Sequence, residues 1–202
     1  MKTIDFFLFS LSPFTYFVDG RLSKIAAKYN CQIRYRPFAL LDVFAQTGGT
    51  PPAQRHESRK KYRSQEIARI AKKLAMPITL VPKFWPTNPI PSCYAIINAQ
   101  AFYDQHKKGD LEGLTRAILR SCWADEKDIA DEVLINELLK ANGFPSDIIN
   151  KNAEYAADCY KENTNEAVRR NVFGAPSFLV DDQVFWGQDR LDYLDDYLAE
   201  NS

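Results

Sequence analysis

The sequence predicts an α/β fold in which strand-forming ends enclose a large all-helical insertion. Two observations predict this class. The apolar run Ile4–Phe9 is too short for a typical helix and is typical of a buried strand, and strand-like segments return only near the C-terminus. Between them, helical periodicity dominates. We therefore expect one domain built from residues 1–39 and 163–202, with residues 40–162 as a helical insertion domain.

The first strand leads directly into a helix start at Ser12-Pro13. Serine caps the free N–H groups of a helix, and proline fits the first turn because it has no N–H to satisfy. Apolar residues then recur at helical spacing, which predicts a helix from about Pro13 to Tyr29. Ligands bind beside the carboxyl ends of strands in open α/β sheets, and a helix start favours an anion or a thiolate. Ser12 is therefore the first candidate site residue.

Periodicity and turn residues predict the next elements. Gln32–Arg36 alternates polar and apolar side chains, which predicts a strand parallel to the first. Arg55–Leu74 predicts an amphipathic helix whose buried side carries Tyr62, Ile67, Ile70, Ala71 and Leu74. The rest of the middle is expected to form a short helical turn at 40–45, a loop at 47–52, a proline-rich extended loop at 76–91, helices at 92–108, 110–124 and 129–142, and a helix from Ser146.

The C-terminal part returns to strand signals. Asn163-x-x-Glu166 is a capping-box pattern, which predicts the start of a new, shorter helix. Ser177–Val180 and Val184–Trp186 flank a turn and predict a β-hairpin, and a last helix follows Gly187. Pro176 stands at the entry to the hairpin and has no N–H for the sheet. The residue before it can therefore offer its backbone to a ligand.

Composition excludes several classes of partner. The chain has 26 basic and 26 acidic residues, so it has no global basic field and nucleic acid is not an expected partner. No apolar run reaches the roughly 18 residues that span a bilayer, and the N-terminus lacks a secretory pattern. We expect a cytoplasmic protein without a membrane partner. Four separated cysteines, without Cys-x-x-Cys or zinc spacing, predict reduced thiols and no metal site.

Three short motifs, in order and at matching distances, resemble one protein family. They are Leu11-Ser12-Pro13-Phe14, residues 172–178 (Val-Phe-Gly-Ala-Pro-Ser-Phe) and residues 185–191 (Phe-Trp-Gly-Gln-Asp-Arg-Leu). In these the chain is similar to the 2-hydroxychromene-2-carboxylate isomerases and kappa-class glutathione transferases, glutathione-dependent relatives of the DsbA-type disulfide oxidoreductases. The resemblance also covers residues 123–134. It implies a thioredoxin-like fold with a large all-helical insertion.

The first turn departs from the redox relatives, because it carries Ser12 and Thr15 where disulfide exchange needs two thiols. That site cannot exchange disulfides, so its sulfur must come from outside, and the resemblance supplies glutathione as the cofactor. By position, Ser12 would hydrogen-bond the glutathione sulfur. The resemblance further implies a backbone contact from Ala175 before a cis Pro176, an ammonium contact from Asp189 and a carboxylate contact from Gln188.

The contacts to the glycyl end of glutathione stay open. Gly49, together with Arg59 or Lys60, falls in the region where the family holds that end, but many kappa-type members carry asparagine where this chain has Gly49. The basic run Arg59-Lys60-Lys61 otherwise predicts a solvated helix face, and a contact to a ligand carboxylate is the alternative.

The resemblance also marks candidate substrate residues. Asn88 resembles a family asparagine near the substrate pocket, and Tyr94 stands where many kappa-type members have arginine. Three aromatic residues would suit a flat substrate, or else belong to the core: Phe14, Phe84 and Trp85.

The resemblance implies a glutathione-dependent isomerase that interconverts 2-hydroxychromene-2-carboxylate and trans-o-hydroxybenzylidenepyruvate, a step in naphthalene-type aromatic breakdown. The partners would then be glutathione and a small aromatic or bicyclic substrate, and relatives of this type are commonly homodimers. One alternative is a kappa-type glutathione transferase that conjugates electrophiles through the same site. Another is a glutathione-binding protein without turnover.

Overall fold

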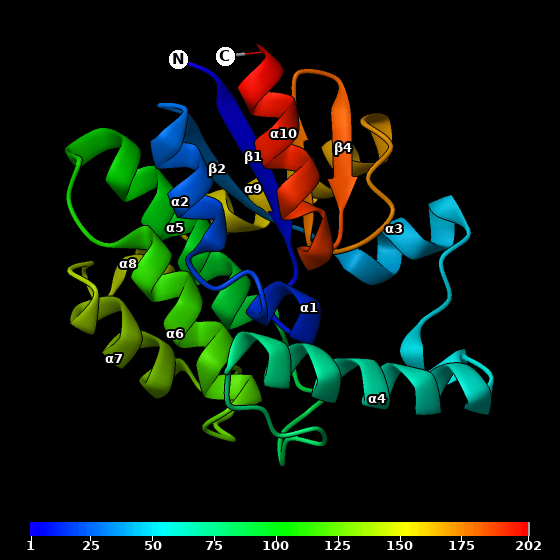
Figure 1. Cartoon of the computed structure of the whole chain (residues 1–202). Coiled ribbons are helices and arrows are strands. Elements are labelled where there is room, and N and C mark those ends of the chain that lie inside the picture. The colour runs from blue at the N-terminus through cyan, green and yellow to red at the C-terminus, as the bar shows by residue number, and fades with distance from the viewer. Residues whose placement is uncertain (202) are drawn as a thin grey trace.

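The structure, a computed structural model that describes residues 1–201, is built on a mixed four-stranded sheet (Figure 1). The strand order is β2-β1-β3-β4. The central strand β1 pairs in parallel with β2 and antiparallel with β3, and β3 and β4 form a hairpin. All four strands were predicted from the sequence. Their bounds are Thr3–Leu8 for β1, Gln32–Pro37 for β2, Ser177–Val180 for β3 and Gln183–Trp186 for β4.

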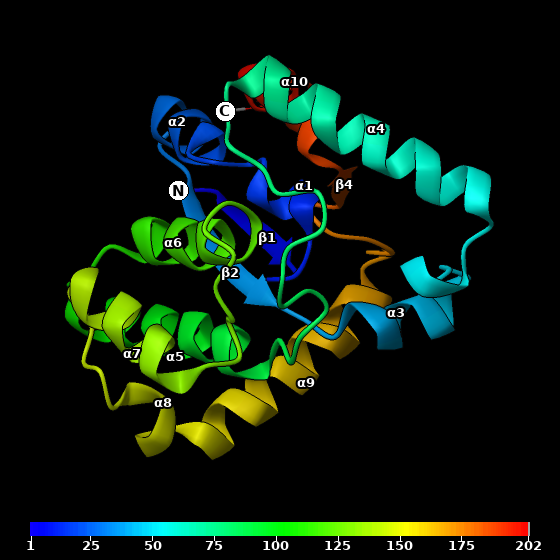
Figure 2. The same ribbon diagram turned by 90° about the horizontal axis from the view of Figure 1, so that it is seen from below.

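Helices cover both faces of the sheet. Figure 2 shows α2 and α10 on one side of the strands, and α5 and α9 on the other. The helices are α1 (Pro13–Tyr16), α2 (Arg21–Lys28), α3 (Leu40–Thr47), α4 (Glu57–Leu74), α5 (Ile90–His106), α6 (Leu111–Trp123), α7 (Glu132–Ala141), α8 (Ile148–Lys151), α9 (Ala153–Arg169) and α10 (Leu191–Asn201), with short 3-10 helices at Pro52–Gln54 and Gln188–Arg190.

The core explains why β1 is apolar along its whole length. Successive side chains of a strand point to opposite faces. Phe6 belongs to the larger hydrophobic cluster, where its ring stacks on Phe178 at 5.3 Å, whereas Phe7 belongs to a smaller cluster around Phe38 and Val43. Because both faces of β1 are covered, its sequence is a continuous apolar run rather than an alternating one.

The prediction of one helix from Pro13 to Tyr29 is wrong, because the chain breaks after a single turn. α1 ends at Tyr16 and α2 begins at Arg21. Gly20 lies between them in the left-handed region with φ 68°, a conformation that glycine adopts without the cost of a Cβ clash. Apolar periodicity continues across the break, since both Leu22 and Ala26 are buried. The periodicity therefore concealed the turn.

Asn163 does not open a new helix, so the capping-box prediction is wrong. The residue lies inside α9, which runs without interruption from Ala153 to Arg169. Its Nδ2 donates to the carbonyl of Pro37 at 3.0 Å, and its Oδ1 accepts from Arg36 at 3.1 Å. The amide thus joins α9 to the end of β2. The domain boundary predicted at residues 162 and 163 falls within this helix, and the division into domains stays a prediction.

The buried apolar residues of α4 lie in its second half. Ile67 and Ala71 are buried there, as predicted. Tyr62 was expected on the same buried side, but its side chain is 59% exposed because the first half of the helix extends beyond the core. α4 lies next to α1 in both ribbon views. The Tyr16 hydroxyl of α1 donates to the carbonyl of Pro77, just after α4, at 2.9 Å.

A buried carboxylate links the two parallel strands to α9. The Oδ1 atom of Asp5 lies 2.6 Å from Arg36 Nε, and its Oδ2 lies 2.7 Å from Arg170 Nη1. Asp5→Asn removes the anion that pairs with Arg36 and leaves Arg170 only the more distant Glu166 at 4.0 Å, so we expect the free energy of unfolding to fall by about 3 kcal/mol. Urea denaturation with an unchanged m-value would measure the loss.

The matched control for this stability prediction is Asp195→Asn. Asp195 pairs with Lys28 across α10 and α2 at 2.9 Å, but the lysine side chain is 56% exposed. Exposed ion pairs contribute little, so we expect a change below about 1 kcal/mol. An equal fall in the free energy of unfolding of the two variants would show that the burial of Asp5 does not make its ion pairs more stabilising than an exposed pair.

Candidate active site

Ser12 lies at the carboxyl end of β1, where the chain turns into α1. It is the N-cap of α1, and its Oγ accepts a hydrogen bond from the Thr15 N–H at 3.3 Å. The same hydroxyl donates weakly to the carbonyl of Ala175 at 3.4 Å. The structure thus brings Ser12 next to the segment before β3, although 163 residues separate them in sequence.

The loop that faces Ser12 is fixed on several sides. The Ala175–Pro176 peptide bond is cis, as the resemblance implied. Ser177 Oγ donates to the carbonyl of Gly174 at 2.9 Å, and the Gly187 N–H donates to that of Pro176 at 2.9 Å. A Cβ on Gly174 would meet the Trp186 ring at 2.2 Å, so this close approach requires glycine. Within residues 1–201 the Ala175 N–H has no hydrogen bond. It is therefore free to bind a ligand.

Arg21 ties the first turn to the turn that carries Gln188 and Asp189. Its Nη2 donates to the carbonyl of Phe17 at 2.7 Å, to the carbonyl of Gln188 at 3.0 Å and to Gln188 Oε1 at 2.6 Å. Burial lowers the pKa of this guanidinium from its ordinary value. Sequence reasoning missed Arg21. An arginine in the first turn of a helix opposes the helix dipole, and that is the signal that could have identified it.

The two candidate residues of this turn differ in availability. Gln188 is buried, and its Oε1 is taken by Arg21, so its Nε2 is the group left for a ligand. The carboxylate of Asp189 is exposed, and one oxygen lies 3.4 Å from Arg190. A Cβ on Gly187 would meet Asp189 Oδ1 at 2.5 Å. Glycine at this position lets the carboxylate lie against the backbone.

Trp85 reaches the Ser12 turn from the proline-rich loop. Its indole Nε1 donates to the carbonyl of Leu11 at 3.2 Å, and its ring lies 5.8 Å from that of Trp123. Phe14 packs against the same core, whereas Phe84 is 39% exposed. Of the three predicted aromatic residues, Trp85 is the one with a hydrogen bond to the backbone beside Ser12.

Other candidate residues have local structural roles. The Oδ1 of Asn88 accepts from the Ile90 N–H at 3.1 Å, at the start of α5. Tyr94 packs edge-on against Tyr160. A Cβ on Gly49 would meet the Phe44 ring at 2.2 Å, so packing alone requires glycine there. The ligand contacts suggested for Asn88 and Gly49 stay predictions.

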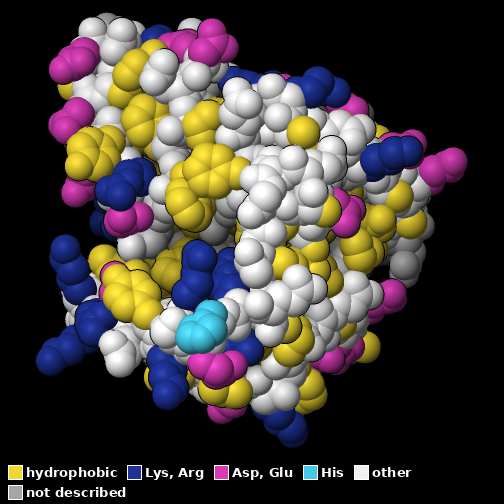
Figure 3. Space-filling model, turned by 90° about the vertical axis from the view of Figure 1, so that its right-hand side faces the viewer, with side chains coloured by type: hydrophobic (Ala, Val, Ile, Leu, Met, Phe, Trp, Pro, Cys, Tyr) yellow, Lys and Arg dark blue, Asp and Glu magenta, His cyan; other side chains and the backbone are white. Residues whose placement is uncertain are grey.

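Basic side chains gather on α4 and on the segment before it. Figure 3 shows Lys and Arg gathered over the lower part of this face, beside a hollow in the surface. Lys60 pairs with Glu57 at 2.8 Å, whereas Arg59 has no ion pair within residues 1–201. Arg55 donates from Nε to the carbonyl of Thr50 at 2.8 Å. Of the two predicted alternatives, Arg59 is thus the cation free to bind an anion.

The two buried thiols of the protein, Cys93 and Cys122, do not suit a nucleophilic role at Ser12. Cys93 is fully buried, 3.5 Å from the hydroxyl of Ser10, and burial raises the pKa of its thiol to about 11. Burial likewise raises the pKa of Cys122 to about 12. Both thiols therefore stay protonated at neutral pH. In the described part of the chain, no three His, Cys, Asp or Glu side chains gather as metal ligands.

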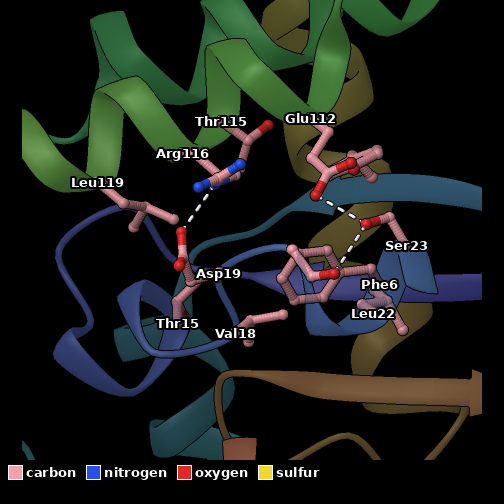
Figure 4. Close-up of a pocket in the computed structure, with 12 residues that line it drawn as sticks. Phe6, Thr15, Val18, Asp19, Leu22, Ser23, Glu112, Thr115, Arg116 and Leu119 are labelled. Carbon is pink, nitrogen blue, oxygen red and sulfur yellow. Dashed lines mark hydrogen bonds and ion pairs between the residues drawn. The ribbon is translucent and has the colours of Figure 1, made fainter. Parts of the chain in front are cut away.

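A small cavity lies on the α6 side of α1. Figure 4 shows Glu112 and Arg116 of α6 facing Ser23 and Asp19, with hydrogen bonds of 2.7 Å in each pair. The cavity volume is about 20 Å³, which holds a single water molecule. The buried Thr15 hydroxyl lines it and has no hydrogen bond among the described residues. The space is too small for a peptide ligand such as glutathione.

Along residues 1–201, no helix has both the length and the apolar character needed to cross a bilayer.

Comparisons with known proteins identify the family of the chain. The DSBA-like thioredoxin domain family matches residues 3–199. A 2-hydroxychromene-2-carboxylate isomerase from Sphingobium xenophagum is 30% identical over 202 residues, which cover 98% of this chain and 99% of the relative. Glutathione S-transferase kappa 1 from Caenorhabditis elegans is 29% identical and covers 99% of this chain and 92% of its own.

Solved structures show the same fold. A structure of 2-hydroxychromene-2-carboxylate isomerase superposes with a TM-score of 0.79 at 23% identity, and covers 98% of this chain and 95% of its own. The cytosolic disulfide reductase DsbM from Pseudomonas aeruginosa, solved with GSH, superposes with a TM-score of 0.68 at 16% identity, over 98% and 99% of the two chains. The chain belongs to the DSBA-like thioredoxin family, together with the 2-hydroxychromene-2-carboxylate isomerases and the kappa-class glutathione transferases.

Proposed function

We propose that the protein is a glutathione-dependent isomerase that interconverts 2-hydroxychromene-2-carboxylate and trans-o-hydroxybenzylidenepyruvate. One observation carries the proposal: the Ser12 hydroxyl faces Ala175 at a site with no thiol of its own, in a chain 30% identical to an isomerase of that name. The chemistry at this site needs a sulfur from outside the chain. The kappa-class glutathione transferases among the relatives support glutathione as its source.

Four groups in the described structure fit the parts of glutathione. The free N–H of Ala175 and its carbonyl can bind the cysteinyl backbone. The exposed carboxylate of Asp189 suits the γ-glutamyl ammonium, and Gln188 Nε2 suits the adjacent carboxylate. Arg59 is a cation without an ion pair among the described residues and suits the glycyl carboxylate. Ala175 lies next to the Ser12 hydroxyl, and Arg21 joins Gln188 to Phe17 at the end of α1, so the sulfur would be directed toward that hydroxyl.

Ser12 would stabilise the sulfur as a thiolate. A thiol has a pKa of about 8.5, and each unit of depression requires about 1.4 kcal/mol. A hydrogen bond to a charged acceptor contributes roughly 1.5 to 3 kcal/mol. Because α1 is only four residues long, its dipole adds little, about 0.3 kcal/mol. Together these effects lower the pKa by about one to two units, enough for a large thiolate fraction at neutral pH.

Glutathione, when bound, would supply a thiolate that adds reversibly to the substrate, permits rotation about a carbon–carbon bond and leaves unchanged. The protein's part is to hold the sulfur and to place the substrate beside it. The Ser12 hydroxyl can turn from the Ala175 carbonyl, a weak acceptor at 3.4 Å, toward the sulfur. Trp85 offers a flat apolar wall for an aromatic substrate next to this turn.

A spectrophotometric assay with 2-hydroxychromene-2-carboxylate, with and without glutathione, tests the proposal. We expect conversion to the pyruvate isomer that depends on glutathione and leaves the concentration of free thiol constant. Loss of free thiol in proportion to product would indicate the transferase, which the kappa-class relatives make the second candidate. Saturable glutathione binding without either reaction would indicate a binding protein. The proposal also includes a cytoplasmic homodimer, whose mass size-exclusion chromatography with light scattering would measure.

A further inference from the structure

Three arginines lie just before α4 and in its first half. Arg55 precedes the helix, and Arg59 and Arg63 follow at intervals of four residues, so the last two lie on one helix face. Burial and, to a smaller extent, the positive charge of Arg59 lower the pKa of Arg55, and burial together with the charge of Arg55 lowers the pKa of Arg63. The three like charges are therefore close enough to repel one another.

This cluster has no acidic partner in the part of the chain that the structure describes. Other cations of α4 do: Lys60 pairs with Glu57, and Arg69 pairs with Glu66 at 3.1 Å. Glu66 lies three residues after Arg63 and could have paired with it, but it turns to Arg69 instead. A half-buried guanidinium that carries no hydrogen bond or ion pair among residues 1–201 is costly, and an anionic ligand would offset that cost.

Arg63 is also the arginine that reaches toward Ser12. Its guanidinium carbon lies 5.4 Å from the centre of the Trp85 ring, and Trp85 Nε1 donates to the carbonyl of Leu11, the residue before Ser12. The contact between cation and ring fixes the guanidinium beside a flat apolar surface. A cationic fork and an aromatic wall thus stand together at the edge of the Ser12 turn.

We propose that Arg63 and Trp85 form a subsite for the carboxylate of a planar aromatic substrate, with Arg55 adding positive charge. The inference rests on the proposed function, since it places the substrate acid next to the thiolate site. A guanidinium matches a carboxylate with two parallel N–H donors, and the indole ring favours a flat hydrophobic neighbour. The same subsite disfavours a neutral ester, because the ester leaves the guanidinium unpaired.

The test compares an acid with its neutral ester. Binding of trans-2-hydroxycinnamate and of its methyl ester is measured by calorimetry with saturating glutathione, in the wild type and in Arg63→Gln. We expect the wild type to bind the acid about 10 to 100 times more tightly than the ester, as a charge-assisted hydrogen bond would give. In Arg63→Gln the affinity for the acid should fall by this factor of about 10 to 100, whereas the affinity for the ester should stay within about twofold of the wild type.

Arg69→Gln is the matched control. Arg69 lies on the same helix and stacks on Tyr62 at 5.9 Å, much as Arg63 stacks on Trp85, but it is paired with Glu66. We expect this variant to keep the preference for the acid. Arg63→Lys keeps the charge but not the planar fork, so it should recover only part of the acid affinity.

Equal affinity of the wild type for acid and ester, or no binding of either, would overturn the subsite. An equal loss of affinity for the acid and the ester in Arg63→Gln would also overturn the subsite, because it would mean that the arginine only supports Trp85. The turnover assay with 2-hydroxychromene-2-carboxylate reports separately on the proposed function. A preference for the acid that depends on Arg63, in a protein without isomerase activity, keeps the subsite and rejects the isomerase.

Discussion

Ser12→Ala should lower kcat/KM for the isomerisation by about 10- to 100-fold at pH 7, the loss of one hydrogen bond to a charged sulfur. Since the hydroxyl acts by lowering the thiol pKa, the deficit should shrink as the pH rises. Above about pH 9 the thiol ionises without help, and the variant should approach the wild type. The measurement is a pH profile of kcat/KM for both proteins. We expect the apparent pKa in the profile of the variant to be about one to two pH units higher than in that of the wild type.

Two further serine variants separate chemistry from folding. Ser12→Thr keeps the hydroxyl and the helix cap, so it should retain most of the activity. Ser10 is a fully buried serine that accepts from Ser92 at 2.8 Å and makes none of the contacts proposed for glutathione, so Ser10→Ala should stay within about threefold of the wild type. Ser12→Ala also removes the cap to Thr15, at a cost of about 1 kcal/mol in stability. If the loss of kcat/KM in Ser12→Ala were the same at every pH, Ser12 would not act by stabilising the thiolate.

The strands could be predicted because the burial of a strand determines which of its residues are apolar. β1 is apolar because both of its faces are covered, and the hairpin of β3 and β4 is separated by a turn of two aspartates, Asp181 and Asp182. The break after α1 was not predicted, because Leu22 and Ala26 keep the helical period across it. The Asp19-Gly20 pair is a turn signal that local reasoning could have used.

The site residues that could be predicted are those that belong to a recognisable local sequence pattern. A serine before a proline and a glycine-x-proline before a strand are such signals, and the structure brings Ser12 and Ala175 together. Arg21 and Arg63 were missed because their importance depends on what lies across from them after folding. In sequence, both are basic residues in helices, typical of solvated faces. In the structure, Arg21 donates a hydrogen bond to Gln188. Arg63 lies over the ring of Trp85 and has no acidic partner among the described residues.

Asp189→Asn should raise the KM for glutathione about 10- to 30-fold, with a smaller effect on kcat. The substitution removes the negative charge that would face the γ-glutamyl ammonium, and a hydrogen bond between charged groups is roughly twice as strong as one between neutral groups. Asp192→Asn makes the same charge change one turn further along, in the first turn of α10. We expect this control to leave the KM for glutathione within about twofold. Steady-state kinetics at varied glutathione measure both values.

A glutathione analogue in which hydrogen replaces the γ-glutamyl ammonium completes a double-mutant cycle. If Asp189 binds that ammonium, the wild type should bind the analogue about 10- to 30-fold more weakly than glutathione, and Asp189→Asn should bind the two alike. The two losses then report one shared contact. Additive losses would place the ammonium elsewhere and leave Asp189 as an exposed acidic residue at a helix start, partnered by Arg190. Because the cycle compares ratios, a general loss of stability in the variant cannot imitate the expected result.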